Sequence, residues 1–123
     1  MRNQTSSLLS DPMKYSNISR PLEEIENLSD IDYHNIKKTA MVLRSLNHNL
    51  RQQVIKTIHE NKRITVTQLL IKLRLEQSVA SQHLGILRKA GIVSTERDGK
   101  FIFYSINSSR IDAINQYVKN LVG

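Results

Sequence analysis

The chain has 123 residues, 39% of them hydrophobic, which is enough for one domain with a modest core. It contains no cysteine, so disulfides, thiolate metal sites and cysteine nucleophiles are excluded. The formal net charge is +7, and the excess lies after residue 33, where 15 Lys and Arg stand against five Asp and Glu, as is typical of domains that bind nucleic acid.

The sequence has neither an apolar run long enough to cross a membrane nor the charged and apolar regions of a signal peptide. Its cations are spread over several predicted elements and do not gather on one long amphipathic helix, which disfavours binding to a membrane surface. We therefore expect a cytoplasmic protein with no membrane partner.

Residues 1–30 predict a flexible arm in front of the folded domain. They are rich in Ser and Asn, contain both prolines and show little apolar periodicity. A short helix at residues 19–28, capped by Ser19, is the ordered element that the pattern allows there. The folded domain is expected at residues 31–123.

The first two helices of the domain are predicted from apolar residues at helical spacing. The first begins at Asp30 or Asp32, either of which can cap it, and ends at about residue 48. Asn49 is the expected cap of the second helix, which ends by residue 61. We expect its outer, solvated side to carry Arg51 and Lys56.

A short strand and a third helix follow. Arg63 and Ile64 can pair briefly as a strand, and Thr65 and Gln68 have the spacing of a capping box. In that motif the two side chains accept hydrogen bonds from each other's backbone N–H groups at the start of a helix. The third helix is therefore predicted at residues 66–73, followed by a turn at 74–76.

The stretch from residue 75 to 91 predicts a helix with two distinct faces. The apolar face comprises Ala80, Leu84, Leu87 and Ala90, and the polar face comprises Gln77, Ser78, Ser81, Gln82, Gly85, Arg88 and Lys89. The first half of the polar face carries amides and hydroxyls that can reach base edges, and the second half carries two cations that suit phosphates. Taken alone, the pattern also fits an ordinary amphipathic helix with a solvated face.

A β-hairpin with a basic tip is predicted directly after this helix. Residues 92–97 and 100–106 are rich in β-branched and aromatic residues, and Asp98-Gly99 between them predicts a tight turn. Arg97 and Lys100 flank the tip, where they can contact phosphates or a minor groove. A short helix, a turn, a polar-faced helix and a hairpin together predict a winged helix-turn-helix, whose second helix enters the major groove.

A last helix is predicted after Asn107 or Ser108, either of which can cap it. Its apolar stripe comprises Ile111, Ile114, Tyr117, Val118 and Leu121. The stripe can complete the core of one chain or join two chains, and we expect it to be the interface of a homodimer. The predicted fold is mainly helical, in the order α-α-(short β)-α-α-β-β-α.

Several segments resemble the ArsR/SmtB family of bacterial transcriptional repressors. They are QSVASQHL at 77–84, LRKAGIV at 87–93, RDGK at 97–100 and YSI at 104–106, and the resemblance spans about residues 32–122. It implies a homodimer that binds an inverted repeat in a promoter and usually represses transcription. By position it implies base contacts from Gln77, Ser78, Ser81 and Gln82, and a wing that carries Arg97 and Lys100.

The chain departs from this family at the positions of its metal ligands. One sensor type has Glu-Leu-Cys-Val-Cys-Asp-Leu where this chain has residues 63–69, so Thr65 and Thr67 replace the two thiolates, and threonine does not bind soft metals. In a second type, three ligands of the last helix correspond to Ser108, Arg110 and Leu121. We therefore expect no bound metal, no cofactor and an effector that the sequence does not identify.

The four histidines do not change this expectation. None has a second histidine or a carboxylate at helical spacing that would build a metal site within one helix. His83 lies at the edge of the apolar face of the 75–91 helix, where we expect a hydrogen-bonded structural histidine.

Two other classes of function compete with DNA-binding regulation. An enzyme is disfavoured because the chain has no Gly-rich phosphate loop, GxSxG elbow or HExxH helix. A winged helix can also bind RNA or another protein, and RNA binding would use aromatic residues exposed on the sheet. Phe101 and Phe103 share one face of their strand, which we expect to pack against the helices. We therefore predict a DNA-binding transcriptional regulator, with repression as the expected direction.

Overall fold

The computed structural model describes residues 30–123. The predicted arm at residues 1–30, including its short helix, therefore lies outside the described residues except for Asp30. The chain splits after His34 into two units, and the fold below is that of Asn35–Gly123 together with the start of the first helix. None of the described helices is both long and apolar enough to cross a membrane.

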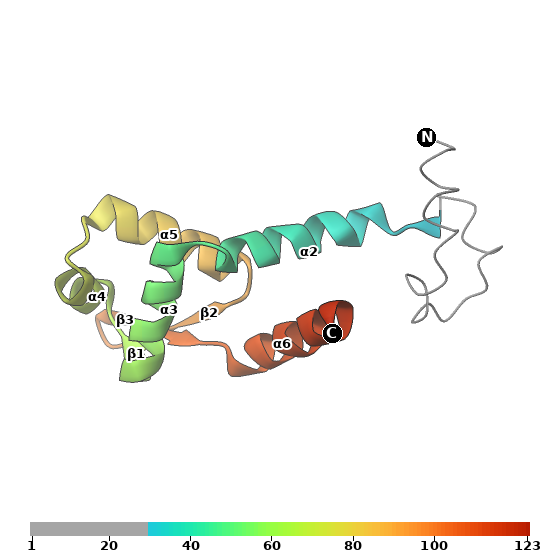
Figure 1. The fold of residues 1–123 in the computed structure, drawn as a ribbon. Coiled ribbons are helices and arrows are strands. Elements are labelled where there is room, and N and C mark those ends of the chain that lie inside the picture. Colours follow the sequence, from blue (N-terminus) through green and yellow to red (C-terminus); the bar gives the residue numbers. More distant parts are fainter. Residues whose placement is uncertain (1–29) are drawn as a thin grey trace. The chain divides into compact units, whose positions relative to one another are not determined.

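The described residues form five helices and three strands in the predicted order (Figure 1). The helices are α2 (Tyr33–Leu46), α3 (Asn49–Asn61), α4 (Val66–Leu73), α5 (Gln77–Lys89) and α6 (Ser108–Val122). The strands are β1 (Arg63–Ile64), β2 (Val93–Asp98) and β3 (Phe101–Ile106), in one antiparallel sheet of order β1-β3-β2. The predicted winged helix-turn-helix is confirmed.

The start of α4 and the end of α5 follow from their local sequence. Thr65 Oγ1 accepts a hydrogen bond from the Gln68 backbone N–H at 3.2 Å, and Gln68 Oε1 accepts one from the Thr65 N–H at 3.0 Å, so the predicted capping box is confirmed. After α5, Gly91 has a φ of +78°, and the Ile92 N–H donates to the Leu87 carbonyl at 2.9 Å. This left-handed residue ends the helix and suits glycine.

The cap of α3 differs from the prediction. His48, and not Asn49, caps α3: its Nδ1 accepts from the backbone N–H groups of Leu50 and Arg51 at 3.2 and 3.4 Å. The first helix, α2, therefore ends two residues earlier than expected, at Leu46, and leaves His48 free of it. An imidazole nitrogen can serve here because a cap needs only an acceptor aimed at the first N–H groups.

At the other end, Asn107 caps α6 and Ser108 is its first residue. The Asn107 side-chain oxygen accepts from the Arg110 backbone N–H at 3.3 Å. The same oxygen accepts from the Ser109 hydroxyl at 2.9 Å. Asn107 was one of the two predicted caps.

The hairpin turn lies one residue later than predicted. Asp98 pairs with Phe101, so it is the last residue of β2 and the two-residue loop is Gly99-Lys100. Gly99 has a φ of +63°, and among the described residues Lys100 is not one of those with a positive φ. A positive φ at only the first loop position is the pattern of a type II′ turn, which needs glycine there. The sequence signal for a hairpin was right, but its exact loop was not.

The two faces of the sheet also differ from the prediction. Tyr104 and Ile106 on β3 pack against the core, whereas Phe101, on the opposite face, is 52% exposed. Phe103 shares that outer face, where the Arg63 guanidinium lies 4.0 Å from the centre of its ring. The expectation that Phe101 and Phe103 pack against the helices is therefore wrong, because alternation along β3 gives the inner face to the other residues.

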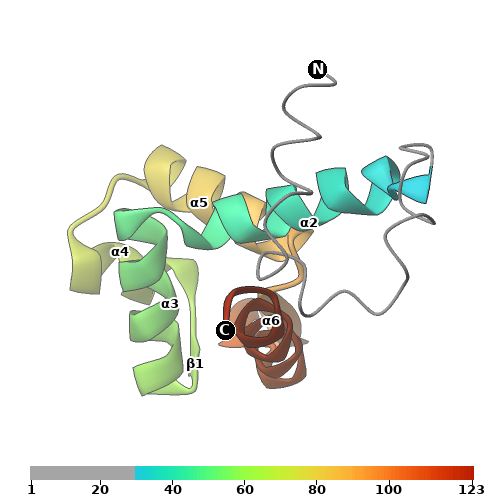
Figure 2. The ribbon, with the colours of Figure 1, turned by 45° about the vertical axis from the view of Figure 1, so that its right-hand side comes forward.

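The hydrophobic core joins α3, α4, α5 and the sheet. Its buried members are Val54, Ile58, Ile64, Leu69, Leu84, Leu87, Ala90, Ile92 and Val93. In contrast, α6 has no buried residue, and in α2 only Ser45 is buried. In both ribbon views α6 runs below α2 (Figures 1 and 2), and its residues Ile111 and Ile114 pack against the edge of this core. The core therefore holds α5 and the wing in place, and the two terminal helices lie at its margin.

Candidate nucleic-acid interface

Helix α5 turns its apolar face inward and its polar face to solvent, as predicted. Ala80 and Leu87 are fully buried, and Leu84 is 2% exposed. The six polar candidates on this helix are all exposed: Gln77, Ser78, Ser81, Gln82, Arg88 and Lys89. A Cβ built on Gly85 would meet no atom within 4 Å, so no part of the chain crowds this face. The helix therefore presents a continuous polar surface.

The turn between α4 and α5 has the compact geometry of a helix-turn-helix. Arg74 ends α4 in the left-handed conformation, with a φ of 53° and a ψ of 48°, and its N–H donates to the Leu70 carbonyl. The Leu75 N–H donates to the same carbonyl at 3.1 Å. These bonds close α4 within two residues, so α5 starts almost at once and in a fixed direction.

The wing carries both cations and acids, but its acids pair with Arg63 and not with the two cations near its tip. Arg63 on β1 pairs with Asp98 at 3.2 Å and lies 3.8 Å from Glu96, so one guanidinium faces both carboxylates of β2. Arg97 and Lys100 are exposed, and neither forms an ion pair with another described residue. Two cations at the tip of the wing thus stay available for phosphates.

Comparisons with known proteins decide the family. The model of "Bacterial regulatory protein, arsR family" matches residues 49–95, from the start of α3 into β2. The transcriptional repressor PagR of Bacillus anthracis is 32% identical over 84 residues, covering 68% of this chain and 84% of PagR. The transcriptional activator HlyU of Vibrio cholerae serotype O1 is 30% identical over 95 residues, covering 77% of this chain and 86% of HlyU. The chain belongs to the ArsR family.

The solved structures agree with this assignment. The crystal structure of PagR matches with a TM-score of 0.58 and 30% identity, covering 71% of this chain and 99% of the PagR chain. The resemblance inferred from residues 77–93 and from the wing is therefore confirmed. As an ArsR-family protein, the chain is a transcriptional regulator with a DNA-binding helix-turn-helix.

One residue behind α5 was assigned wrongly from the sequence. Arg51 was expected on the solvated side of its helix, but it is only 8% exposed. Its Nε donates to the Ser45 carbonyl at 2.6 Å, its Nη2 donates to the Arg44 carbonyl at 3.1 Å, and its Nη1 lies 3.3 Å from His83 Nδ1. A signal existed, because positions 51, 54 and 58 share one helical face and the other two are apolar.

His83 on α5 is the structural histidine that the sequence predicted. It is partly buried, contacts Arg51, and stacks with His48 at a ring-centre distance of 4.9 Å. Burial lowers the pKa of His83 below its usual value of 6.5, and the nearby His48 and Arg51 lower it further. Burial and these two neighbours therefore favour the neutral form of His83.

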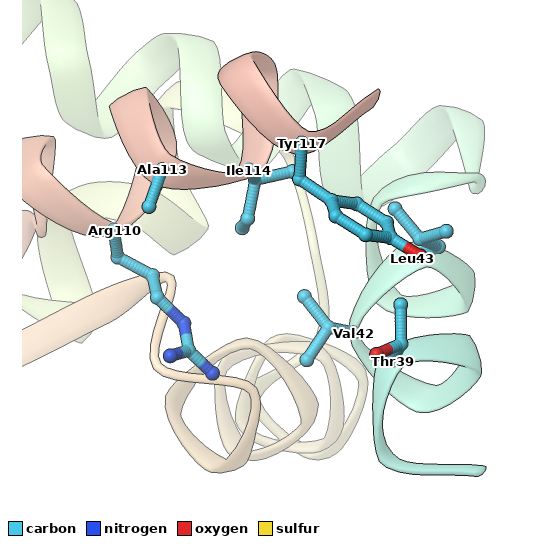
Figure 3. A pocket seen from close by; sticks show the side chains of 7 residues that line it. All are labelled: Thr39, Val42, Leu43, Arg110, Ala113, Ile114 and Tyr117. Atoms are coloured by element: carbon cyan, nitrogen blue, oxygen red, sulfur yellow. The ribbon is translucent and has the colours of Figure 1, made fainter. Parts of the chain in front are cut away.

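An open cavity of about 190 Å³ separates α2 from α6 (Figure 3). Its lining consists of Thr39, Val42, Leu43, Arg110, Ala113, Ile114 and Tyr117. Arg110 donates from Nε to the Ala90 carbonyl at 3.2 Å, which ties α6 to the end of α5. Further along α6 the chain itself supplies little cover, since Tyr117 is 47% exposed and Leu121 is 68% exposed. The outer part of the predicted interface stripe, at Tyr117 and Leu121, is therefore accessible in one chain.

At the positions where the family's metal sensors have ligands, two residues of this chain make structural hydrogen bonds. Thr65 caps α4 with its hydroxyl, and Arg110 binds the Ala90 carbonyl. Among the described residues, no group of three or more His, Asp or Glu side chains could hold a metal ion.

Proposed function

We propose that this ArsR-family chain binds an inverted-repeat operator as a homodimer and represses transcription of the promoter that contains it. The observation that carries the proposal is the exposed polar face of α5, whose first half can hydrogen-bond to base edges. Gln77, Ser78, Ser81 and Gln82 would read bases, and Arg88 and Lys89 would bind phosphates. Arg97 and Lys100 would add phosphate or minor-groove contacts from the wing.

The homodimer is supported by the apolar surface of α6. Ile111 and Ile114 are partly buried against the core of one chain, but Tyr117 and Leu121 remain mostly uncovered. Ile36 on α2 is also 53% exposed, so both helices that border the cavity carry unburied apolar side chains. A second copy that packs on Ile111, Ile114, Tyr117, Val118 and Leu121 would bury them. A two-fold dimer would then present two α5 helices about 34 Å apart, one turn of the duplex.

Repression is the direction that we propose, by occupation of promoter DNA. PagR is named a repressor, whereas HlyU is named an activator, so the two relatives differ on this point. We propose no enzymatic activity and place the protein in the cytoplasm, where a bacterial regulator meets its promoter.

We also propose that regulation does not use a metal ion or another cofactor. The described residues lack the ligand sets discussed above, and threonine at 65 is already used as a helix cap. Stoichiometric Zn(II), Cd(II), Ni(II) or As(III) should therefore neither release DNA nor shift the melting temperature, because a ligand that does not bind the folded state cannot stabilise it. A reproducible increase of several degrees with one ion, lost on mutation of a histidine, would contradict this.

Binding of RNA is the alternative that one observation favours. Phe101 is exposed on the outer face of the sheet, contrary to our prediction, and exposed aromatic residues can stack with single-stranded bases. The same face carries Glu96 and Asp98, whose charges oppose a phosphate backbone. The DNA interface on α5 has no such acids, which is why we favour it.

The experiment that tests the proposed function is selection of bound duplexes from a randomised pool by the full chain. We expect enrichment of an inverted repeat whose half-sites are separated by about one helical turn or a multiple of it. Enrichment of single-stranded RNA from a parallel pool, with no enriched duplex, would instead support the alternative. Binding to all duplexes alike would contradict sequence-specific regulation.

A further inference from the structure

We propose that Arg51 is a positioning residue for DNA recognition, which fixes α5 against the junction of α2 and α3 through its contact with His83. This inference rests on the proposed function, because it concerns the helix that we expect to read bases. Arg51 itself lies behind α5 and is 8% exposed, so it does not contact DNA. Its effect must pass through the atoms it bonds.

The three contacts of Arg51 run to two different helices. Nε and Nη2 donate to the carbonyls of Ser45 and Arg44 in the last turn of α2, at 2.6 and 3.1 Å. These carbonyls are near the end of the helix, where the regular i→i+4 bonds run out. Nη1 lies 3.3 Å from His83 Nδ1 on α5. One rigid, planar guanidinium therefore holds the end of α2 and the middle of α5 at a fixed separation.

The anchor on α5 stands next to the residues that we expect to read bases. His83 directly follows Gln82, and Ser81 lies one residue further back. A helix that rotates about its axis moves all of these side chains together, so a fixed His83 fixes the direction of the neighbouring amide and hydroxyl. Base contacts depend on such alignment, because a hydrogen bond weakens steeply when its angle or distance is wrong.

The contact requires a neutral His83, because Arg51 can only donate. Nδ1 must then be the unprotonated nitrogen, a tautomer inferred from its partner. The charged or titratable groups that face His83 are Arg51 on α3 and His48 in the turn before it. His48 Nδ1 is itself an acceptor from two backbone N–H groups of α3. No carboxylate is among the groups that shift the pKa of His83, so a proton on His83 would gain no acidic partner and would lie beside the Arg51 guanidinium.

The sign of the pH effect follows from this arrangement. Because burial, His48 and Arg51 lower the pKa of His83, the unfolded chain takes up the proton first as the pH falls below 6.5. The stability contributed by the neutral form is present above pH 6.5 and is lost as the pH falls from there through the lowered pKa. In the folded chain, protonation turns Nδ1 into a donor and breaks its contact with Arg51. Preference for the operator should therefore fall as the pH drops through the lowered pKa of the folded chain.

The test measures preference, the ratio of affinities for the selected duplex and for a random duplex, in four folded variants. Arg51→Lys keeps the charge but lacks the planar fork, and Arg51→Met removes the donors. Each should lower preference about tenfold, the loss expected from one weakened base contact, while random-duplex affinity stays nearly unchanged. His83→Asn places a non-titrating amide oxygen at the position of Nδ1, so its preference should lose the acid sensitivity of the wild type, whatever its absolute value. His59→Gln removes an exposed histidine of α3 outside the cluster and should behave as the wild type.

Each outcome has a distinct meaning. If the wild-type chain shows no preference at any pH, the proposed function fails and this inference fails with it. If the wild type is selective but both Arg51 variants, folded by circular dichroism, are equally selective, only the inference is overturned. Should the Arg51 variants not fold, the pH profile of His83→Asn decides. A profile that falls with acid as steeply as the wild-type profile would overturn the inference, and a flat one would support it.

Discussion

Helices α5 and α6 have similar amphipathic patterns, but only α5 buries its apolar face within the chain. In α5, Ala80, Leu84 and Leu87 are at most 2% exposed, whereas no residue of the longer α6 is buried. Leu121 of α6 is 68% exposed, although it continues an apolar stripe as regular as that of α5. An amphipathic stripe therefore predicts that a face will be covered, but not by which chain.

The difference divides the molecule into a part that is complete in one chain and a part that is not. The core of α3, α4, α5 and the sheet buries its apolar side chains without help. The exposed residues of α6 gain burial only from another molecule, which we propose is a second copy. Changes in α5 should therefore act on the fold of each chain, and changes at the end of α6 should act on assembly.

The largest expected effect comes from a charge placed in the proposed interface. Leu121→Asp should abolish the dimer and operator binding, because burying an unpaired carboxylate in an apolar contact costs on the order of several kcal/mol. Leu121 is a cleaner site than Ile114, which also packs against the core of its own chain. Light scattering measures the mass in solution, and fluorescence anisotropy measures operator binding.

The matched control is Gln116→Asp, which adds the same charge on the opposite, exposed side of α6. It should remain a dimer with near-normal operator affinity. A folded Leu121→Asp dimer with full affinity would show that the interface lies elsewhere on the molecule.

Smaller effects are expected when a leucine is replaced by alanine in each of the two helices, and they should differ between α5 and α6. Leu84→Ala removes a side chain that is 2% exposed and should lower the free energy of unfolding by about 2–5 kcal/mol. Leu121→Ala removes an exposed side chain and should act mainly on the dimer. Urea unfolding at several protein concentrations distinguishes them, since the deficit of Leu121→Ala should shrink once the wild type also dissociates. If both variants lost the same free energy of unfolding at every protein concentration, Leu121 would belong to the fold of one chain, as Leu84 does, and not to a dimer interface.

The order of elements and the polar face of α5 could be predicted because they depend on local patterns. The capping box at Thr65 and Gln68, the short strand at residues 63–64 and the bounds of α4 were predicted correctly. Each is decided by neighbours in the sequence: a cap and its third residue, or apolar residues at helical spacing. The exposure of the six predicted DNA-binding residues on α5 follows from the same periodicity, and that of Arg97 and Lys100 from their place at the hairpin tip.

The errors concern features that depend on contacts between distant segments. Arg51 shares a helical face with Val54 and Ile58, a local signal for its burial, but the carbonyls of α2 and the His83 ring that bond it come from other segments, which helical spacing does not reveal. Which face of β3 meets the core depends on how the sheet packs on the helices: Tyr104 and Ile106 face the core, so Phe103 lies on the outer face, where Arg63 from β1 covers its ring. The hairpin loop shifts by one residue where Asp98 is paired in the sheet and bonded to Arg63. Direct contact of any residue with DNA, and the dimer itself, stay predictions.

The central claim is that the polar face of α5 reads bases while the wing binds the backbone. It is tested most directly by measuring the affinities of Gln82→Ala and Lys100→Ala for the selected operator and for a random duplex over a range of salt. Gln82→Ala should weaken operator binding by about 1–3 kcal/mol and leave random binding nearly unchanged. Lys100→Ala should weaken both and reduce the slope of log K against log salt by about one. Unchanged preference in Gln82→Ala would contradict the assignment of α5 to the major groove.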